Sequence, residues 1–135
     1  MGSRVTGPAV HRPFLALGAS NAFLAVAMGA FGAHALQGRL APGLAEVWQT
    51  AVEYHLAHAL GLVLLSLLCA ALPGCVRVRW SGVLMVLGIA LFSGSLYLMA
   101  LTGERWLGAV TPFGGGAFLA AWALLTTAAW CEASG

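Results

Sequence analysis

The fold is decided by the stretch YHLAHALGLVLLSLLCAALPGCV, residues 54–76, which carries no charged side chain. It contains 23 residues, and an α-helix needs only ~20 apolar residues to cross a bilayer. Three further uncharged windows of similar length cover residues 13–38, 80–103 and 106–131. The sequence therefore predicts an all-α integral membrane bundle of four transmembrane helices.

The small number of charged residues agrees with this prediction. Charged residues make up 7% of the chain, whereas ordinary soluble domains carry about 25%. All of them are arginine or glutamate, and the net charge is only +2. This composition excludes a disordered chain, a nucleic-acid-binding domain and a conventional soluble enzyme, and it makes the lipid bilayer the expected partner.

We expect one transmembrane domain over residues 13–131, flanked by tails at 1–12 and 132–135. The four spans are predicted at about residues 14–34, 53–72, 80–101 and 111–130. Pro73 and Gly74 end the second span, while Thr111 as N-cap and Pro112 as first helical residue begin the fourth.

Residues 36–52 form the longest connection between spans. After Pro42, apolar residues recur at helical spacing opposite polar ones, which predicts a short interfacial helix before the second span. The same pattern also allows one unbroken helix from Pro42 to Leu72, whose first turns would protrude from the membrane or bend over its surface.

The first span has a competing interpretation as a signal peptide. Arg4 and Arg12 precede it, and Ala33-His34-Ala35 resembles a cleavage site. Its apolar stretch, residues 14–33, is longer than the usual 7–15 residues of a signal peptide. The length favours a retained transmembrane helix.

The arginines predict the orientation. With four spans, both tails and the loop at 73–79 share one side of the membrane, which carries four of the six arginines. Positive residues are retained on the cytoplasmic side. We therefore expect a multi-pass protein of the bacterial inner (plasma) membrane with both termini in the cytoplasm.

Three cysteines, Cys69, Cys75 and Cys131, fall near this same side. Their number is odd and their spacing is not that of a metal site. Because the cytoplasm keeps thiols reduced, we interpret them as small apolar side chains and not as a disulfide framework.

Small residues recur at spacings of three and four in the first span, where they allow close contact between helices. They suit packing within the bundle, with a homo-oligomer or a larger membrane complex as the alternative. The glycines predicted at helix contacts are Gly29, Gly32, Gly94, Gly114, Gly115 and Gly116.

Polar side chains inside a membrane are costly, so their positions are the main functional clue. The predicted topology sends several of them towards one pocket at the non-cytoplasmic end. This predicted polar cluster consists of His34, Glu53, Tyr54, His55, His58, Tyr97 and Thr111.

The cluster has three interpretations. In the first, these groups only hydrogen-bond between helices. In the second, His34, His55 and His58 bind Zn, Cu or haem, with Glu53 as a further ligand or supporting group. In the third, the cluster belongs to a proton or small-solute path, although the cytoplasmic half offers only Asn21, Ser66, Ser93 and Ser95.

The first interpretation is preferred, because hydrogen bonds between helices are the common use of such groups in membrane proteins. The sequence also contains no nucleophile–base pair, phosphate loop or paired carboxylates. We therefore expect a structural or accessory protein that is not an enzyme and holds no cofactor.

Four motifs in order resemble the YgdD-like family of small bacterial inner-membrane proteins, which has a transmembrane relative in animals. The motifs are GAFGAHAL (29–36), TAVEYHLAHALGL (50–62), LFSGSLYLMALTG (91–103) and TPFGGGAFLAAW (111–122). The resemblance covers about residues 14–130. It implies a four-helix membrane protein and no known reaction. The family's recurring polar and turn positions match His34, Tyr54, His55, His58, Ser93, Gly94, Tyr97, Thr111 and Pro112.

Overall fold

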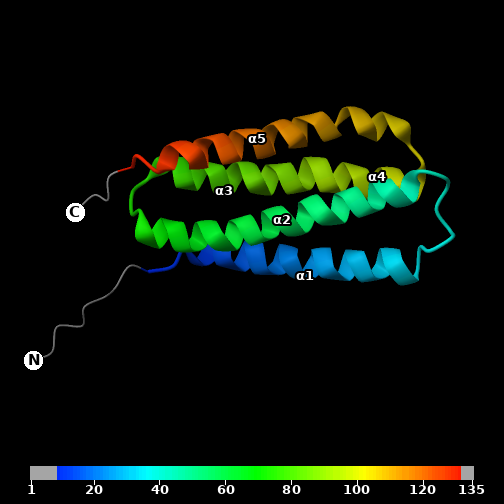
Figure 1. Cartoon of the computed structure of the whole chain (residues 1–135), viewed down its shortest axis with the longest axis horizontal. Helices are drawn as coiled ribbons and strands as arrows, with labels where there is room; N and C mark the ends of the chain where they lie inside the picture. Colours follow the sequence, from blue (N-terminus) through cyan, green and yellow to red (C-terminus); the bar gives the residue numbers. More distant parts are fainter. Residues whose placement is uncertain (1–8, 132–135) are drawn as a thin grey trace, which may run out of the picture.

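Four long helical rods lie side by side in a computed structural model that describes residues 9–131 (Figure 1). The first two rods are α1 (Arg12–His34) and α2 (Leu44–Ala71). The third rod is α3 (Val76–Gly88), the π-helix η1 (Ile89–Ser93) and α4 (Gly94–Thr102), and the fourth is the 3-10 helix η2 (Arg105–Ala109) and α5 (Thr111–Ala128). All four rods are long and apolar enough to cross a membrane. The predicted all-α transmembrane bundle is confirmed.

Helix α2 is the central element of the bundle. Helix α1 packs along it on one side, and α3 and α4 pack along it on the other, while α5 packs mainly on α3 (Figure 1). One end of the bundle carries residues 9–12, the turn at 72–75 and residues 129–131, and we call it the terminal end. The opposite end carries the connections at 35–43 and 103–110.

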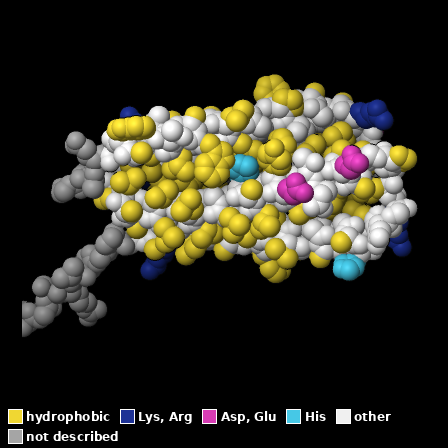
Figure 2. Space-filling model, in the orientation of Figure 1, with side chains coloured by type: hydrophobic (Ala, Val, Ile, Leu, Met, Phe, Trp, Pro, Cys, Tyr) yellow, Lys and Arg dark blue, Asp and Glu magenta, His cyan; other side chains and the backbone are white. Residues whose placement is uncertain are grey.

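The outside of the bundle is apolar and its ends are charged. Large hydrophobic side chains such as Phe23, Leu60 and Leu119 are exposed. Figure 2 shows hydrophobic side chains over the length of the bundle, with arginines near its two ends. Such a surface suits lipid contact along the rods and water or headgroups at the ends.

The segment predicted as a separate interfacial helix is the beginning of α2. This helix starts at Leu44, directly after the left-handed Gly43, and continues for 28 residues. At 1.5 Å per residue it is about 42 Å long, well beyond the ~30 Å hydrocarbon core. The structure thus has the unbroken helix that the sequence left open.

The start of α5 differs from the prediction by one residue. Thr111 is already helical and the N-cap position belongs to Val110, which itself has helical backbone angles. The reason is that η2 runs almost directly into α5. The Thr111 hydroxyl instead lies 2.7 Å from Ser95 Oγ on α4.

The interpretation of the cysteines was wrong for two of them. A disulfide joins Cys75, just before α3, to Cys131, just after α5, with Cα atoms 6.0 Å apart. Because α3 and α5 pack along each other, their ends meet at the terminal end, although 56 residues separate the two cysteines. Cys69 is a half-buried free thiol.

Several glycines let helices approach closely. A Cβ atom on Gly32 would collide with the Trp48 ring, and one on Gly114 with the Phe92 backbone. The small residues of α1 pack within the chain, since a Cβ on Gly18 would lie 2.8 Å from Val63 on α2. Gly94 and Gly116 make no comparable contact.

The glycine run of α5 gives a matched test of this packing. Gly114→Ala should lower the free energy of unfolding by about 1–3 kcal/mol, because the added methyl group would overlap the Phe92 backbone. Gly116→Ala meets nothing within 4 Å and should be neutral or stabilising by up to ~1 kcal/mol through helix propensity. Thermal unfolding in detergent measures both. An equal change in the free energy of unfolding in the two variants would contradict the packing argument.

Candidate functional site

His55 joins three rods near the centre of the bundle. Its Nε2 lies 3.0 Å from Asn21 Oδ1 on α1, and its Nδ1 lies 3.1 Å from the Tyr97 hydroxyl on α4. Asn21 Nδ2 donates to the Leu17 carbonyl, which turns Oδ1 towards the histidine. An amide oxygen only accepts, so Nε2–H donates to it, and in the neutral ring Nδ1 accepts from the Tyr97 hydroxyl. Both ring nitrogens are therefore occupied.

His58 joins α2 to α5 in a comparable way. Its Nδ1–H donates to the Tyr54 carbonyl at 2.7 Å, and its Nε2 accepts from Trp122 Nε1–H at 3.0 Å. The ring also stacks on Phe118, with centroids 3.5 Å apart and planes 10° apart. The lone pair that a metal would need is used by Trp122.

The two histidines lie deeper than predicted. His55 comes eleven residues after Leu44, or about 17 Å along a helix of about 42 Å. The prediction of a cluster at one end assumed that the second span begins near Glu53. Since α2 begins nine residues earlier, His55 and His58 lie near its middle.

A π-helical turn, which the sequence did not reveal, lies beside His55. It is η1, and in it Ser93 Oγ donates to the Ala51 carbonyl of α2 at 2.9 Å. A serine hydroxyl in a helix can bond a carbonyl of its own helix, as Ser95 does with Phe92, but Ser93 does not. The hydroxyl instead satisfies an acceptor on the neighbouring rod and ties η1 to α2.

The remaining members of the predicted polar cluster do not join the His55 hydrogen bonds. His34 is the last residue of α1 and is exposed, and Glu53 is exposed on α2. Tyr54 is 43% exposed and packs its ring against Phe92. Thr111 bonds Ser95. Neighbouring residues on α2 point in different directions, which divides the cluster into separate contacts.

The three histidines proposed as metal ligands are not brought together. Within residues 9–131, no three His, Cys, Asp or Glu side chains are grouped so that they could hold one metal ion. His55 faces α1 and α4, His58 faces α5, and His34 lies at the opposite end. The arrangement is one of hydrogen bonds between helices.

The interior towards the terminal end is closely packed. Leu62, Leu65 and Met85 are fully buried there. Ser66 and Ser81 are also fully buried, and each hydroxyl donates to a backbone carbonyl. In the part of the chain that the structure describes, no buried side-chain nitrogen or oxygen lacks a hydrogen-bond partner. This half offers little to a proton or solute path.

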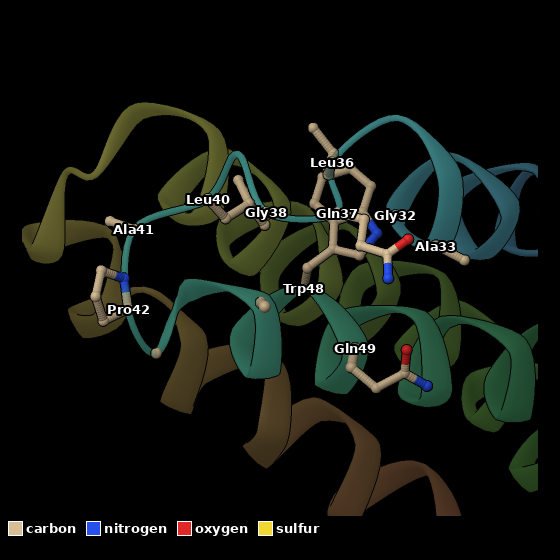
Figure 3. A pocket seen from close by; sticks show the side chains of 12 residues that line it. Gly32, Ala33, Leu36, Gln37, Gly38, Leu40, Ala41, Pro42, Trp48 and Gln49 are labelled. Carbon is tan, nitrogen blue, oxygen red and sulfur yellow. The ribbon is translucent and has the colours of Figure 1, made fainter.

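A cavity of about 380 Å³ lies at the opposite end, between the end of α1, the connection that follows it and the start of α2 (Figure 3). Trp48 contributes to its wall and donates from Nε1 to the Met28 carbonyl at 2.9 Å. Gln37 and Gln49 supply polar groups. Trp48 was not among the predicted site residues, and its place beside Gly32 is what fixes this end of α1 on α2.

A second cavity, about 530 Å³, lies between α2 and α5 and has mainly aromatic walls. Tyr54, His58, Phe92, Phe118 and Trp122 line it, and the exposed Leu119 stands at its edge. Gly115 and Gly116 leave room for it, because they carry no side chain. Its walls are suited to apolar contact with lipid.

The His55 network gives a second matched test. Tyr97→Phe should destabilise the protein by about 0.6 kcal/mol and by at most about 1.7 kcal/mol, the average and the maximum measured for hydrogen bonds within a membrane bundle. Tyr54→Phe is the control, since the Tyr54 hydroxyl bonds no group of residues 9–131, and it should leave stability unchanged. Unfolding in mixed detergent micelles measures the difference. A loss of similar size in both variants would contradict the role given to the Tyr97–His55 bond.

Comparison with known proteins agrees with the fold and adds no activity. The family model described as "Protein of unknown function (DUF423)" matches residues 28–115. The "UPF0382 membrane protein YwdK" of Bacillus subtilis is 49% identical over 86% of this chain and 94% of its own length. The "UPF0382 membrane protein SERP0230" of Staphylococcus epidermidis is 45% identical over 85% and 93%. No solved structure matches. The expected membership of a family of small bacterial membrane proteins without a known activity is confirmed, and the chain belongs to the DUF423 family.

Proposed function

We propose that the protein is a non-enzymatic accessory component of the bacterial plasma membrane that binds a neighbouring transmembrane helix and holds no cofactor. The partner helix belongs to a second copy of the chain or to another membrane protein. The observation that carries the proposal is an acidic side chain, Glu53, exposed within a membrane span.

Glu53 belongs to a face of α2 that no other rod covers. Its residues follow one another at steps of three or four and are all exposed; we call them the α2 face: Glu46, Gln49, Glu53, Ala57, Leu60, Leu64 and Leu67. Acidic side chains lie among hydrophobic ones on the side of the bundle drawn in Figure 2. The α2 face is thus polar in one half and apolar in the other.

The position of Glu53 makes exposure to lipid costly. It follows Leu44 by nine residues, or about 14 Å, while α2 exceeds the hydrocarbon core by only about 12 Å. Even if all of that excess protruded at this end, Glu53 would still start within the hydrocarbon. The cost of a carboxylate in the hydrocarbon rises with its depth, and such groups normally pair with a partner.

Within the described residues, Glu53 receives one hydrogen bond, from Gln49 Nε2 at 3.2 Å. A carboxylate has acceptor sites for several more. A donor on a neighbouring helix would satisfy them and offset the cost of the buried acid, as polar residues do between membrane helices. Leu60, Leu64 and Leu67 would extend the same contact by van der Waals packing.

Enzymatic and metal chemistry find less support in the interior. The nitrogens of His55 and His58 are already committed to hydrogen bonds within the chain. Hydrogen bonds to these rings would have to be broken before either could accept a proton from a substrate or bind a metal. The exposed α2 face requires no such rearrangement.

Photo-crosslinking tests this proposal. A photoreactive residue in place of Leu60 should yield a protein adduct in native membranes, whereas one in place of Leu119, exposed on α5, should yield only lipid adducts. Glu53→Leu should remove most of the protein adduct, because it removes the polar contact. Mass spectrometry of the adduct identifies a second copy or another protein. Lipid adducts alone at Leu60 would refute the proposed interface.

We also propose that both termini lie in the cytoplasm. Arg12, Arg77 and Arg79 lie near the terminal end, while Arg39 and Arg105 lie at the opposite end. Arg4, which adds to the first group, lies outside the described residues. The disulfide at the terminal end favours the opposite orientation, with both termini outside the cytoplasm, because disulfides persist in oxidising compartments. We base the orientation on the arginines, and this choice requires that Cys75 and Cys131, which a disulfide joins in the structure, are reduced in the growing cell.

Thiol labelling of intact cells separates these orientations. In a Cys69→Ala variant, a membrane-permeant maleimide should label Cys75 and Cys131, and a charged, impermeant maleimide should not. A cysteine placed at Gln37, in a chain lacking the native cysteines, is the control and should react with the impermeant reagent. Two results would contradict the proposed orientation: labelling of the native pair only after a reductant is added, or labelling of the pair by the impermeant reagent.

A further inference from the structure

We propose that the terminal end binds the phosphate of an anionic phospholipid headgroup, in a pocket formed by His11, Arg12 and Arg79. The pocket has a volume of about 260 Å³. It is separate from the α2 face and from the histidine contacts, and nothing in the proposed accessory role requires it.

The pocket exists because α1 begins short of the end of α2. The His11 backbone N–H donates to the Ser66 carbonyl at 3.1 Å, so α1 starts beside Ser66, five residues before α2 ends at Ala71. Five residues of helix amount to about 8 Å. This step, closed at the side by the turn at 72–75 and by the start of α3, leaves a hollow at the membrane interface.

The charge in the pocket is positive. Arg12 and Arg79 line it and are exposed, and within residues 9–131 neither guanidinium makes a hydrogen bond or ion pair. Arg77, two residues before Arg79, is different, because it donates to the Thr127 carbonyl at 2.7 Å. The described lining contains no carboxylate. The positive end of the α1 dipole lies at the same place.

This combination fits a phosphate diester. Guanidinium groups present several donors in a plane and bind phosphate oxygens strongly. Basic pockets between transmembrane helices at the membrane surface are sites for anionic headgroups. Val10 and Leu72 add apolar walls, and below the pocket α1 exposes Leu15 and Leu17, which would lie against the acyl chains. These apolar neighbours favour a lipid over free inorganic phosphate.

The test measures binding of phosphatidylglycerol to the full-length protein in detergent, with phosphatidylcholine as the reference lipid. Native mass spectrometry counts the retained lipid, and the thermal midpoint reports stabilisation. We expect the affinity for phosphatidylglycerol to fall roughly tenfold for each arginine removed in R12Q and R79Q, because each loses a charge-assisted hydrogen bond. The double variant should bind both lipids alike.

The double variant R39Q/R105Q is the matched control. It removes the same charge from the opposite end and should keep the preference for phosphatidylglycerol. An equal loss in both double variants would overturn the proposal, since it would mean a general charge effect. So would the absence of a lipid preference, or displacement of phosphatidylglycerol by millimolar inorganic phosphate. Because Arg12 and Arg79 are exposed, we expect the thermal midpoint in phosphatidylcholine to stay unchanged in the variants.

Discussion

In a bilayer, a polar group that finds no partner within the protein finds none in the lipid, and the whole structure follows from this constraint. In a helix the backbone N–H and C=O groups hydrogen-bond to one another, and the buried polar side chains also find partners within the protein. Ser66, Ser81 and Ser93 are fully buried and each donates to a carbonyl. Two of these bonds cross between rods, so satisfying the polar groups also fixes which helix lies against which.

The central position of α2 has the same origin. His55 reaches α1 and α4, and His58, three residues later, reaches α5. A step of three residues leaves the two side chains only about 60° apart around the helix, so the rings leave α2 on one side and then diverge towards different rods. Each ring uses both nitrogens and thereby holds two or more segments in register. Histidine suits this position because its neutral ring both donates and accepts.

The spans could be predicted because lipid imposes a simple rule on sequence, namely that charge is absent over about twenty residues. The sequence left open whether the second helix begins near Pro42 or near Glu53, because Glu46 and Glu53 interrupt the uncharged pattern although the helix continues through them. The splitting of the predicted polar cluster depends on which rod faces each side of α2. The disulfide between Cys75 and Cys131 depends on α3 and α5 being neighbours. Order along the chain determines neither of these pairings.

The same constraint locates function on the surface of the bundle. Where the interior is described, its polar groups are used up by one another, and a group already hydrogen-bonded on every side has little capacity left for a ligand. Among the groups with spare capacity are Glu53 on α2, with one hydrogen bond, and Arg12 and Arg79, which have none among the described residues. The acid lies within the membrane span and calls for a donor on another helix. The arginines lie at the interface, where anionic headgroups are available. Each of the two proposed sites would recognise its partner by charge and hydrogen bonding.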